Sequence, residues 1–327
     1  MQTRRLTRGG LQASVIGLGC WQLGGSWGEV SEDQAMATLH AAADAGVTFF
    51  DTADVYGDGR SERLVGRLLA ERPGEGLVVA TKCGRRVAQE AANYTPEALR
   101  QWAERSLGYL GLDRIPLTQL HCPPDAVYED DRVFDALDQL VADGLLGEYG
   151  VSVETVAQGL RAIERPGVTS VQVIFNAFRL KPLERLLPAC ERAGAGVIVR
   201  VPLASGMLSG KYDENTTFPA DDHRNYNRHG EAFDVGETFS GVPYDVGLQA
   251  VRRLAQVLPE GWSLPEVALR WCADAPGVTT VIPGARNPEQ ARANAAVGDR
   301  PALGADVVAE VEAVYRDLVA PHVHSRW

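Results

Sequence analysis

Four ionisable residues follow short apolar runs at positions typical of strand ends. Asp51, Lys82 and His121 each stand at the last residue of such a run, and Tyr56 lies five residues beyond Asp51. In an α/β enzyme the carboxyl ends of the parallel strands meet at one mouth, where catalytic residues gather. If the three runs are successive strands, the four side chains therefore converge.

The chemistry open to this set is proton transfer to an oxygen. A phenol titrates near pH 10, so Tyr56 is a weak acid at neutral pH unless a cation favours its ionised form. Lys82 could supply that cation if Asp51 held the ammonium in place, and His121 could orient the substrate oxygen through a hydrogen bond. The arrangement suits protonation of a carbonyl oxygen as it gains negative charge. The hydride must then come from a cofactor.

Each of these residues also has a purely structural interpretation. Asp51 and Lys82 could form an ion pair inside the fold, Tyr56 could be an exposed loop aromatic, and His121 could be a neutral histidine bonded to the backbone. Their joint placement on three successive strand ends favours the chemical interpretation. The sequence contains no Gly-x-Ser-x-Gly elbow, His-Glu-x-x-His site or Walker loop, and we expect no metal site.

Eight short apolar runs predict the strands that position these residues. They span Val15–Gly19, Val47–Asp51, Leu77–Lys82, Leu117–His121, Gly147–Val151, Val171–Phe175, Gly196–Val201 and Val278–Pro283. Helical periodicity is found over Ser31–Ala45, Ser61–Leu69, Pro96–Leu110, Val133–Asp143, Val156–Ile163, Pro182–Ala193 and Leu264–Ala275. Eight strand–helix units without a break in composition predict one (β/α)8 TIM barrel domain over residues 1–327.

A doubly wound parallel sheet is the alternative fold. A dinucleotide-binding fingerprint after the first strand would favour it, but the segment 17–22, Gly-Leu-Gly-Cys-Trp-Gln, lacks the third glycine, and helix entry is delayed to Ser31. The barrel is therefore preferred. The segment Leu6–Val15, with Gly9 and Gly10 in its middle, predicts a small N-terminal hairpin.

Two segments depart from the strand–helix alternation. The long loop Tyr212–Val242, after the seventh strand, has no clear period, and its aromatic residues favour a packed lid over a disordered insert. These aromatics are Phe218, Tyr226, Phe233 and Phe239. The end of the chain carries His322, His324 and Trp327, which we interpret as a loose surface tail or a rim over the barrel mouth in preference to a metal site.

The loops after the seventh and eighth strands are suited to an anionic ligand. The run Arg200–Lys211 is rich in small residues, and its backbone N–H groups could face a pyrophosphate. After the eighth strand, Asn287 is a natural N-cap, so Arg286 lies beside a helix N-terminus and suits the 2′-phosphate of NADP. An ordinary barrel loop with a solvated arginine is the alternative. Gln290 could either meet an adenine or close a capping box.

The composition restricts the partners and the compartment. With 32 Lys and Arg against 43 Asp and Glu, the net charge of −11 argues against nucleic acid and anionic membranes. The five cysteines are odd in number and widely spaced, which is typical of reduced cytoplasmic thiols. No apolar signal region or membrane-length apolar run is found. We expect a cytoplasmic protein, monomeric by default with a homo-oligomer possible, that acts on a small molecule.

Together these motifs resemble the aldo-keto reductase superfamily, and they extend over nearly the whole chain. The residues that carry the resemblance are Asp51-Thr-Ala-Asp-Val-Tyr56-Gly, Thr81-Lys82, Leu120-His121-Cys-Pro-Pro, Gly150-Val-Ser152, Gln172, the Pro202-Leu-Ala-Ser-Gly loop, and Ile282-Pro-Gly-Ala-Arg286 with Gln290 and Asn294. The resemblance implies a (β/α)8 barrel that binds NADPH across its mouth and reduces an aldehyde or ketone.

The resemblance also implies a role for each of the four ionisable residues. Tyr56 would be the general acid, and Lys82 would lower the pKa of its phenol. Asp51 would pair with Lys82, and His121 would orient the carbonyl. Trp21, Trp27, Tyr56 and His121 are expected to contact the substrate, although Trp27 could equally be a core residue.

The cofactor site is carried over position by position. The expected residues are Gly19, Cys20, Trp21, Asp51, Ser152, Gln172, Arg200, Val201, Pro202, Leu203, Ser205, Gly206, Lys211, Gly284, Arg286, Gln290 and Asn294. Ser152 and Gln172 match positions that hold the nicotinamide carboxamide in the family. Arg200 stands where many relatives carry an aromatic ring stacked on the nicotinamide, and Val153 replaces an asparagine often found after the serine.

Three functions are compatible with these features. The first is an NADPH-dependent carbonyl reductase of the bacterial type. The second is a nicotinamide-sensing regulatory subunit, which can keep the same four residues. The third is a physiological dehydrogenase of a sugar or polyol, which uses them in reverse. The lack of an obvious partner-binding extension favours the enzyme.

Overall fold

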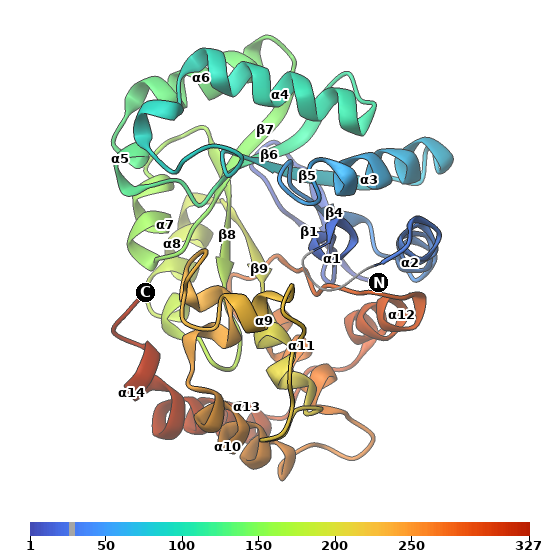
Figure 1. Cartoon of the computed structure of the whole chain (residues 1–327), viewed down its shortest axis with the longest axis vertical. Coiled ribbons are helices and arrows are strands. Elements are labelled where there is room, and N and C mark those ends of the chain that lie inside the picture. The colour runs from blue at the N-terminus through green and yellow to red at the C-terminus, as the bar shows by residue number, and fades with distance from the viewer. Residues whose placement is uncertain (26–29) are drawn as a thin grey trace.

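The computed structural model describes residues 1–25 and 30–327 and contains an eight-stranded parallel sheet closed into a barrel (Figure 1). The sheet runs in chain order from β3 to β10, and it closes through parallel bridges from Ile16 to Val281 and from Gly19 to Gly284. Its strands are β3 (Leu18–Gly19), β4 (Phe49–Asp51), β5 (Val78–Cys83), β6 (Ile115–His121), β7 (Leu146–Ser152), β8 (Val168–Ile174), β9 (Gly196–Arg200) and β10 (Thr280–Val281). The predicted (β/α)8 TIM barrel is confirmed.

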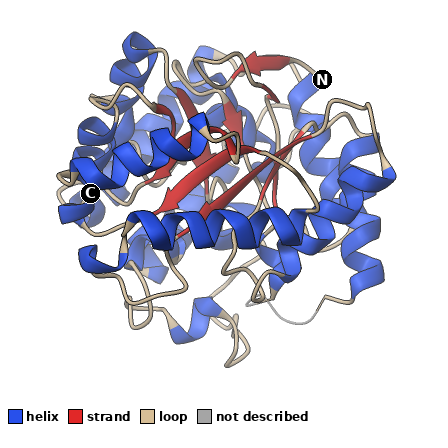
Figure 2. Ribbon diagram, turned by 90° about the horizontal axis from the view of Figure 1, so that it is seen from above, coloured by secondary structure: helices blue, strands red, loops and turns tan. Residues whose placement is uncertain are grey.

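Helices surround the strands, as the view from above shows (Figure 2). Those that follow strands are α2 (Glu32–Asp44), α3 (Arg60–Glu71), α4 (Pro96–Leu110), α6 (Asp131–Ala142), α7 (Val156–Ala162), α8 (Leu186–Ala193), α11 (Leu264–Asp274) and α12 (Pro288–Ala296). Shorter or additional helices are α1 (Trp21–Gly24), α5 (Asp125–Tyr128), α9 (His223–Tyr226), α10 (Tyr244–Ala255), α13 (Ala305–Val314) and α14 (Ala320–Val323). None of the helices in the described part of the chain combines the length and apolar character needed to cross a bilayer.

The first strand lies very close to its two neighbours in the barrel. A Cβ at Gly17 would lie 2.9 Å from the backbone oxygen of Phe49, and one at Gly19 would lie 2.9 Å from that of Ile282. The glycines of this segment therefore allow β3 to pack tightly between β4 and β10. They serve barrel closure and do not form a dinucleotide fingerprint.

The N-terminal hairpin covers one end of the barrel. It consists of β1 (Thr3–Arg5) paired antiparallel with β2 (Gln12–Ser14), as the glycines of the turn predict. Its side chains join the interior cluster formed by Leu6, Ala13, Phe49, Ala80, Leu117, Ile198 and Ile282. Full burial of each large apolar side chain in this cluster stabilises the fold by about 1.5–3 kcal/mol.

The loop 212–242 is packed against the barrel mouth, in agreement with the lid interpretation. Phe218 contacts Tyr212 and Phe239, with ring centroids 5.2 and 5.8 Å apart. Ser240 accepts a 2.8 Å hydrogen bond from the side chain of Asn176, the second residue after the end of β8. We call residues 212–242 the lid.

The C-terminal tail forms a packed rim. Trp327 is 6% exposed, and its indole N–H donates to both carboxylate oxygens of Asp234 in the lid at 3.0 and 3.2 Å. The Arg179 guanidinium lies 4.1 Å above the indole ring. Of the two tail histidines singled out in the sequence, His324 contacts the Tyr315 hydroxyl at 2.8 Å and the Glu184 carboxylate at 3.0 Å.

Candidate active site

Parallel register brings the predicted residues together at the carboxyl ends of β4, β5 and β6. Asp51 is the last residue of β4, Lys82 pairs with Gln119 of β6, and His121 is the last residue of β6. Asp51, Lys82 and His121 are 2%, 0% and 5% exposed. Lys82 Nζ donates to Asp51 Oδ1 at 2.5 Å and lies 3.3 Å from the hydroxyl oxygen of Tyr56.

Tyr56 reaches this group because the loop after β4 packs tightly against α1. Gly57 has φ +60°, and a Cβ there would lie 2.1 Å from the backbone oxygen of Gly24, so no other residue fits without a shift. The Trp21 ring of α1 is stacked on Tyr56 with centroids 6.0 Å apart. On its other side, Tyr56 meets the His121 ring edge-on at 5.8 Å. The phenol is therefore held between an aromatic wall and the ammonium of Lys82.

Burial is the largest single influence on the pKa of Tyr56, Lys82 and His121. Burial raises the pKa of the Tyr56 phenol, and Lys82 opposes this without reversing it, so Tyr56 keeps its proton at neutral pH. Burial lowers the pKa of Lys82, but Asp51 and Tyr56 outweigh it, and the net pKa is raised. Burial, together with Arg85, Lys82 and Arg200, holds the pKa of His121 well below its usual value. The site thus combines a protonated phenol, a cationic lysine and a neutral imidazole.

The second oxygen of Asp51 is also engaged. Gln172 Nε2 donates to Oδ2 at 2.7 Å, and Gln119 Nε2 donates to the same atom at 3.2 Å. Gln172 of β8 is the register partner of Ser152 of β7, so the two residues expected to hold the nicotinamide carboxamide lie on neighbouring strands. Ser152, however, is fully buried, and its Oγ lies 3.5 Å from Cys122 Sγ instead of lining the cavity.

A cavity of about 1170 Å³ is lined by Asp51, Tyr56 and His121. Its volume exceeds the usual range of about 300–1,000 Å³ for small-molecule sites, so it has room for a dinucleotide. Apart from Ser152, all of the predicted cofactor residues line it. They are Gly19, Cys20, Trp21, Asp51, Gln172, Arg200, Val201, Pro202, Leu203, Ser205, Gly206, Lys211, Gly284, Arg286, Gln290 and Asn294. Tyr56 and His121 line the same cavity.

The loop after β9 has the backbone of an anion cradle. Val201, Ala204 and Ser205 have φ values of +54°, +46° and +55°, which are uncommon for residues with a side chain and are costly for a β-branched one. A Cβ at Gly206 would lie 2.3 Å from the Tyr212 hydroxyl oxygen. Left-handed residues of this kind can form a concave backbone site for a phosphate. In this loop Ala204 N and Gly206 N donate to Val201 O and Leu203 O at 3.0 and 2.9 Å and hold the turn. This geometry fits the predicted pyrophosphate site.

The loop after β10 is fixed by the predicted helix cap. The Asn287 side chain accepts from Gln290 N at 2.9 Å, and Pro288 is the first residue of α12. Gln290 Oε1 accepts from Arg286 N at 2.9 Å, one residue before the N-cap Asn287, so this bond does not close a capping box, and Gln290 lines the cavity. In the described part of the chain the Arg286 side chain pairs with no carboxylate, which leaves its guanidinium available to a phosphate.

Several charged residues that the sequence patterns did not single out line the cavity, among them Arg85, Glu154 and Glu237. Arg200 Nη1 lies 2.7 Å from Glu237 and Arg200 Nη2 lies 2.9 Å from Glu154. Arg85 contacts the same carboxylates, Glu154 at 2.8 Å and Glu237 at 3.5 Å. We call these four residues the mouth network. Arg85 and Glu154 follow strand ends, which is a signal that could have found them, whereas Glu237 stands in a lid without any sequence period.

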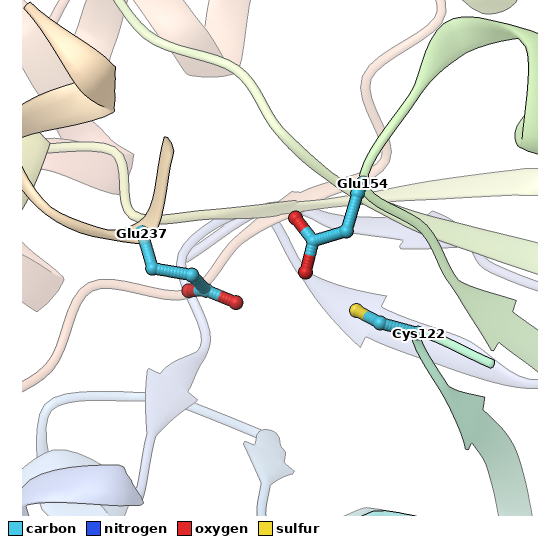
Figure 3. A group of neighbouring side chains, drawn as sticks. All are labelled: Cys122, Glu154 and Glu237. Carbon is cyan, nitrogen blue, oxygen red and sulfur yellow. The ribbon is translucent and has the colours of Figure 1, made fainter. Parts of the chain in front are cut away.

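The carboxylates of Glu154 and Glu237 face one another with the Cys122 thiol beside them (Figure 3). Ligand atoms of these three residues lie within 4.8 Å of one another. Because two guanidiniums already bind both carboxylates, we interpret the group as an ionic network. Burial alone would raise the pKa of Glu154, but Arg200 and Arg85 lower it to about 2. Burial raises the pKa of Glu237, and Glu154 adds to this effect, while Arg200 opposes it.

Trp21, one of the expected substrate residues, packs against the lid. Trp21 contacts Phe233 of the lid with ring centroids 6.1 Å apart and His223 at 5.1 Å. Tyr226 is 36% exposed, so it is the least packed of the lid aromatics. Trp27 lies outside the residues that the structure describes.

Comparison with known proteins agrees with this geometry. A model of the Aldo/keto reductase family matches residues 15–316. The chain belongs to the aldo/keto reductase family. Among curated members of the family, "Aldo-keto reductase YhdN" of Bacillus subtilis (strain 168) is 31% identical over 292 residues, which is 87% of this chain and 85% of the relative.

Two further proteins align with this chain over nearly their whole length. The "Probable voltage-gated potassium channel subunit beta" of Oryza sativa subsp. japonica is 32% identical over 334 residues, covering 96% of each chain. The solved structure of the glycerol dehydrogenase AKR11B4 from Gluconobacter oxydans is 32% identical, with a TM-score of 0.77, and covers 98% of this chain and 96% of that chain. The resemblance read from the motifs is thereby confirmed at the level of the family.

Proposed function

We propose that this protein reduces an aldehyde or ketone to an alcohol with NADPH, and that Tyr56 is the general acid. The observation that carries the proposal is the Tyr56 hydroxyl, 3.3 Å from the buried Lys82 ammonium, on the wall of a cavity that the expected cofactor residues also line. Family membership supports the reaction class.

The chain has residues suited to each part of NADPH. The loop Val201–Gly206, with its positive-φ residues, suits the pyrophosphate, and Arg286 beside the N-terminus of α12 suits the 2′-phosphate. Gln172 lies on the cavity wall and donates to Asp51, so it is placed for the nicotinamide end of the cofactor. When bound, NADPH supplies a hydride to the carbonyl carbon.

The residues of the site then handle the proton and the developing charge. Tyr56 donates its proton to the carbonyl oxygen, and Lys82 stabilises the phenolate that remains. Asp51 holds the ammonium of Lys82 in position. His121, neutral because of its burial, donates a hydrogen bond that orients the oxygen. The same steps in reverse oxidise an alcohol, so the physiological direction follows from substrate and cofactor levels.

The experiment that tests the proposal is a panel of aldehydes, ketones and keto-sugars assayed with NADPH and NADH. We expect NADPH oxidation that depends on the carbonyl, with NADPH preferred over NADH. Sugar and polyol alcohols with NADP⁺ test the reverse direction. Tight NADPH binding without turnover of any carbonyl or alcohol contradicts the enzymatic proposal.

A nicotinamide-sensing regulatory subunit is the second candidate. The observation that favours it is the 32% identity to a probable channel β subunit over 96% of both chains. This candidate predicts NADPH binding with slow or absent turnover and a stable complex with another protein. Rapid multiple turnover of a carbonyl by the isolated protein excludes it as the main function.

A further inference from the structure

Glu237 is the only member of the mouth network that the lid contributes. Its carboxylate lies 2.7 Å from Arg200 and 3.5 Å from Arg85. Its backbone is fixed to the expected cofactor cradle, because Glu237 O accepts from the Ser205 hydroxyl at 2.8 Å and the same hydroxyl accepts from Phe239 N at 3.1 Å. Side chain and backbone therefore place one negative charge at a defined point of the cavity wall.

The mouth network lies close to the part of the cavity that Tyr56 and His121 line. Arg200 Nη2 donates to Val153 O at 3.1 Å and lies 3.7 Å from the sulfur of Cys122, the residue after His121. The charges of Arg85 and Arg200 also act on His121, where they add to the effect of burial on its pKa. Any ring that passes a hydride to a carbonyl held by Tyr56 and His121 lies in the field of these guanidiniums.

The charges of the network balance only when Glu237 is included. Two guanidiniums face two carboxylates, so the group is neutral as a whole, and loss of Glu237 leaves one positive charge in a buried setting. The two forms of a nicotinamide differ in charge as well, because the oxidised ring is a cation and the reduced ring is neutral. A buried positive charge therefore opposes the oxidised form far more than the reduced form.

We propose that Glu237 sets the relative affinity of this protein for NADP⁺ and NADPH by neutralising Arg85 and Arg200 beside the nicotinamide site. The inference rests on the proposed function, because it requires a nicotinamide cofactor in this cavity. Glu237 acts here as a specificity-determining residue for the redox form of the cofactor, and it transfers no proton in the reaction.

The test is equilibrium binding of both cofactor forms at pH 8 to wild type and to Glu237→Gln. This substitution removes the charge and keeps the size of the side chain. We expect the dissociation constant for NADP⁺ to rise on the order of tenfold more than that for NADPH. Isothermal titration calorimetry measures both constants without turnover. Glu237→Asp, which keeps the charge, should leave their ratio close to that of wild type.

Two controls test whether the effect requires a charge at position 237 and a nicotinamide in the ligand. Glu231→Gln removes the same charge from an exposed site on the lid, where the Glu231 carboxylate accepts from His229 N at 2.8 Å, and it should leave the ratio unchanged. 2′-Phospho-ADP-ribose has no nicotinamide, so its affinity should be unchanged in Glu237→Gln.

Three outcomes overturn the inference: equal weakening of both cofactor forms, equal weakening of 2′-phospho-ADP-ribose and NADP⁺, or no change in either form. These outcomes differ from failure of the proposed function itself. In that case wild type binds neither NADPH nor NADP⁺, or binds them without turning over any carbonyl or alcohol.

Discussion

The side-chain amide of Gln172 donates a 2.7 Å hydrogen bond to Oδ2 of Asp51, while Lys82 donates to Oδ1. Gln172 is the residue expected to hold the nicotinamide carboxamide, and here it also supports the carboxylate that anchors Lys82. The barrel interior thus links the expected cofactor contact to the proton donor through one carboxylate. Binding and proton transfer share Asp51 as a common element.

This link predicts different effects for substitutions of the two glutamines that donate to Asp51. Gln172→Met should both weaken NADPH binding and lower kcat, because Gln172 lines the cavity and also supports Asp51.

Gln119→Met is the matched control, since Gln119 donates to the same oxygen at 3.2 Å from a fully buried position. It should lower kcat and leave the NADPH dissociation constant nearly unchanged. Loss of one neutral hydrogen bond is worth about 0.5–1.5 kcal/mol. Identical binding and kinetic profiles for the two variants would mean that Gln172 acts only through Asp51.

Tyr56→Phe removes the proposed proton donor and little surface. We expect carbonyl-dependent NADPH oxidation to fall by a factor of about 10² to 10⁴, the usual contribution of general acid catalysis. NADPH affinity, measured by fluorescence titration, should remain near that of wild type, because Trp21 and His121 still enclose the ring. Turnover at the wild-type rate shows that another group donates the proton.

Arg286→Ala tests the 2′-phosphate contact. The guanidinium stands beside the N-terminus of α12 and faces the cavity. Loss of a charge-assisted hydrogen bond should weaken NADPH by about 1.5–3 kcal/mol and NADH far less. Dissociation constants for both cofactors check this. Equal weakening of NADPH and NADH is incompatible with an arginine that reads the phosphate.

Much of the barrel, and the meeting of the four ionisable residues at its mouth, could be predicted because both depend on local sequence. The strand ends at Asp51 and His121 are marked by apolar runs, and the N-cap at Asn287 is marked by residue type. In a parallel barrel the strand ends meet without any further information. Residues close to strand ends were therefore placed correctly relative to one another.

The remaining features depend on contacts between distant segments. Glu237 meets Arg200 only because the lid folds back over the mouth, and nothing in the lid sequence fixes that path. The helix α10 was not predicted, although its buried residues Leu248, Val251 and Leu254 recur at helical spacing. The upward net shift in the pKa of Tyr56 also could not be read from spacing, because it depends on how completely the lid and α1 bury the phenol.

Asp54, two residues before Tyr56, is fully buried between β5, α3 and α4. Its Oδ2 lies 2.8 Å from Arg105, but burial and the neighbouring Glu62 outweigh Arg105 and Arg86 and raise the pKa of Asp54 from 3.8 to about 6. The folded state therefore binds this proton more tightly than the unfolded chain does. Below pH 3.8 both states are protonated and Asp54 has no cost, whereas above pH 6 the folded state carries the full cost of a buried charge.

Asp54→Asn should remove this pH dependence. The shift from 3.8 to about 6 corresponds to about 3 kcal/mol. The free energy of unfolding of wild type relative to Asp54→Asn should therefore fall by roughly that amount as the pH rises from about 4 to 6.5. Urea unfolding at a series of pH values measures the difference.

Asp58→Asn, on the same loop with its side chain 79% exposed, is the control and should show no such change. A constant difference between wild type and Asp54→Asn across this range means that Asp54 ionises alike in the folded and unfolded states.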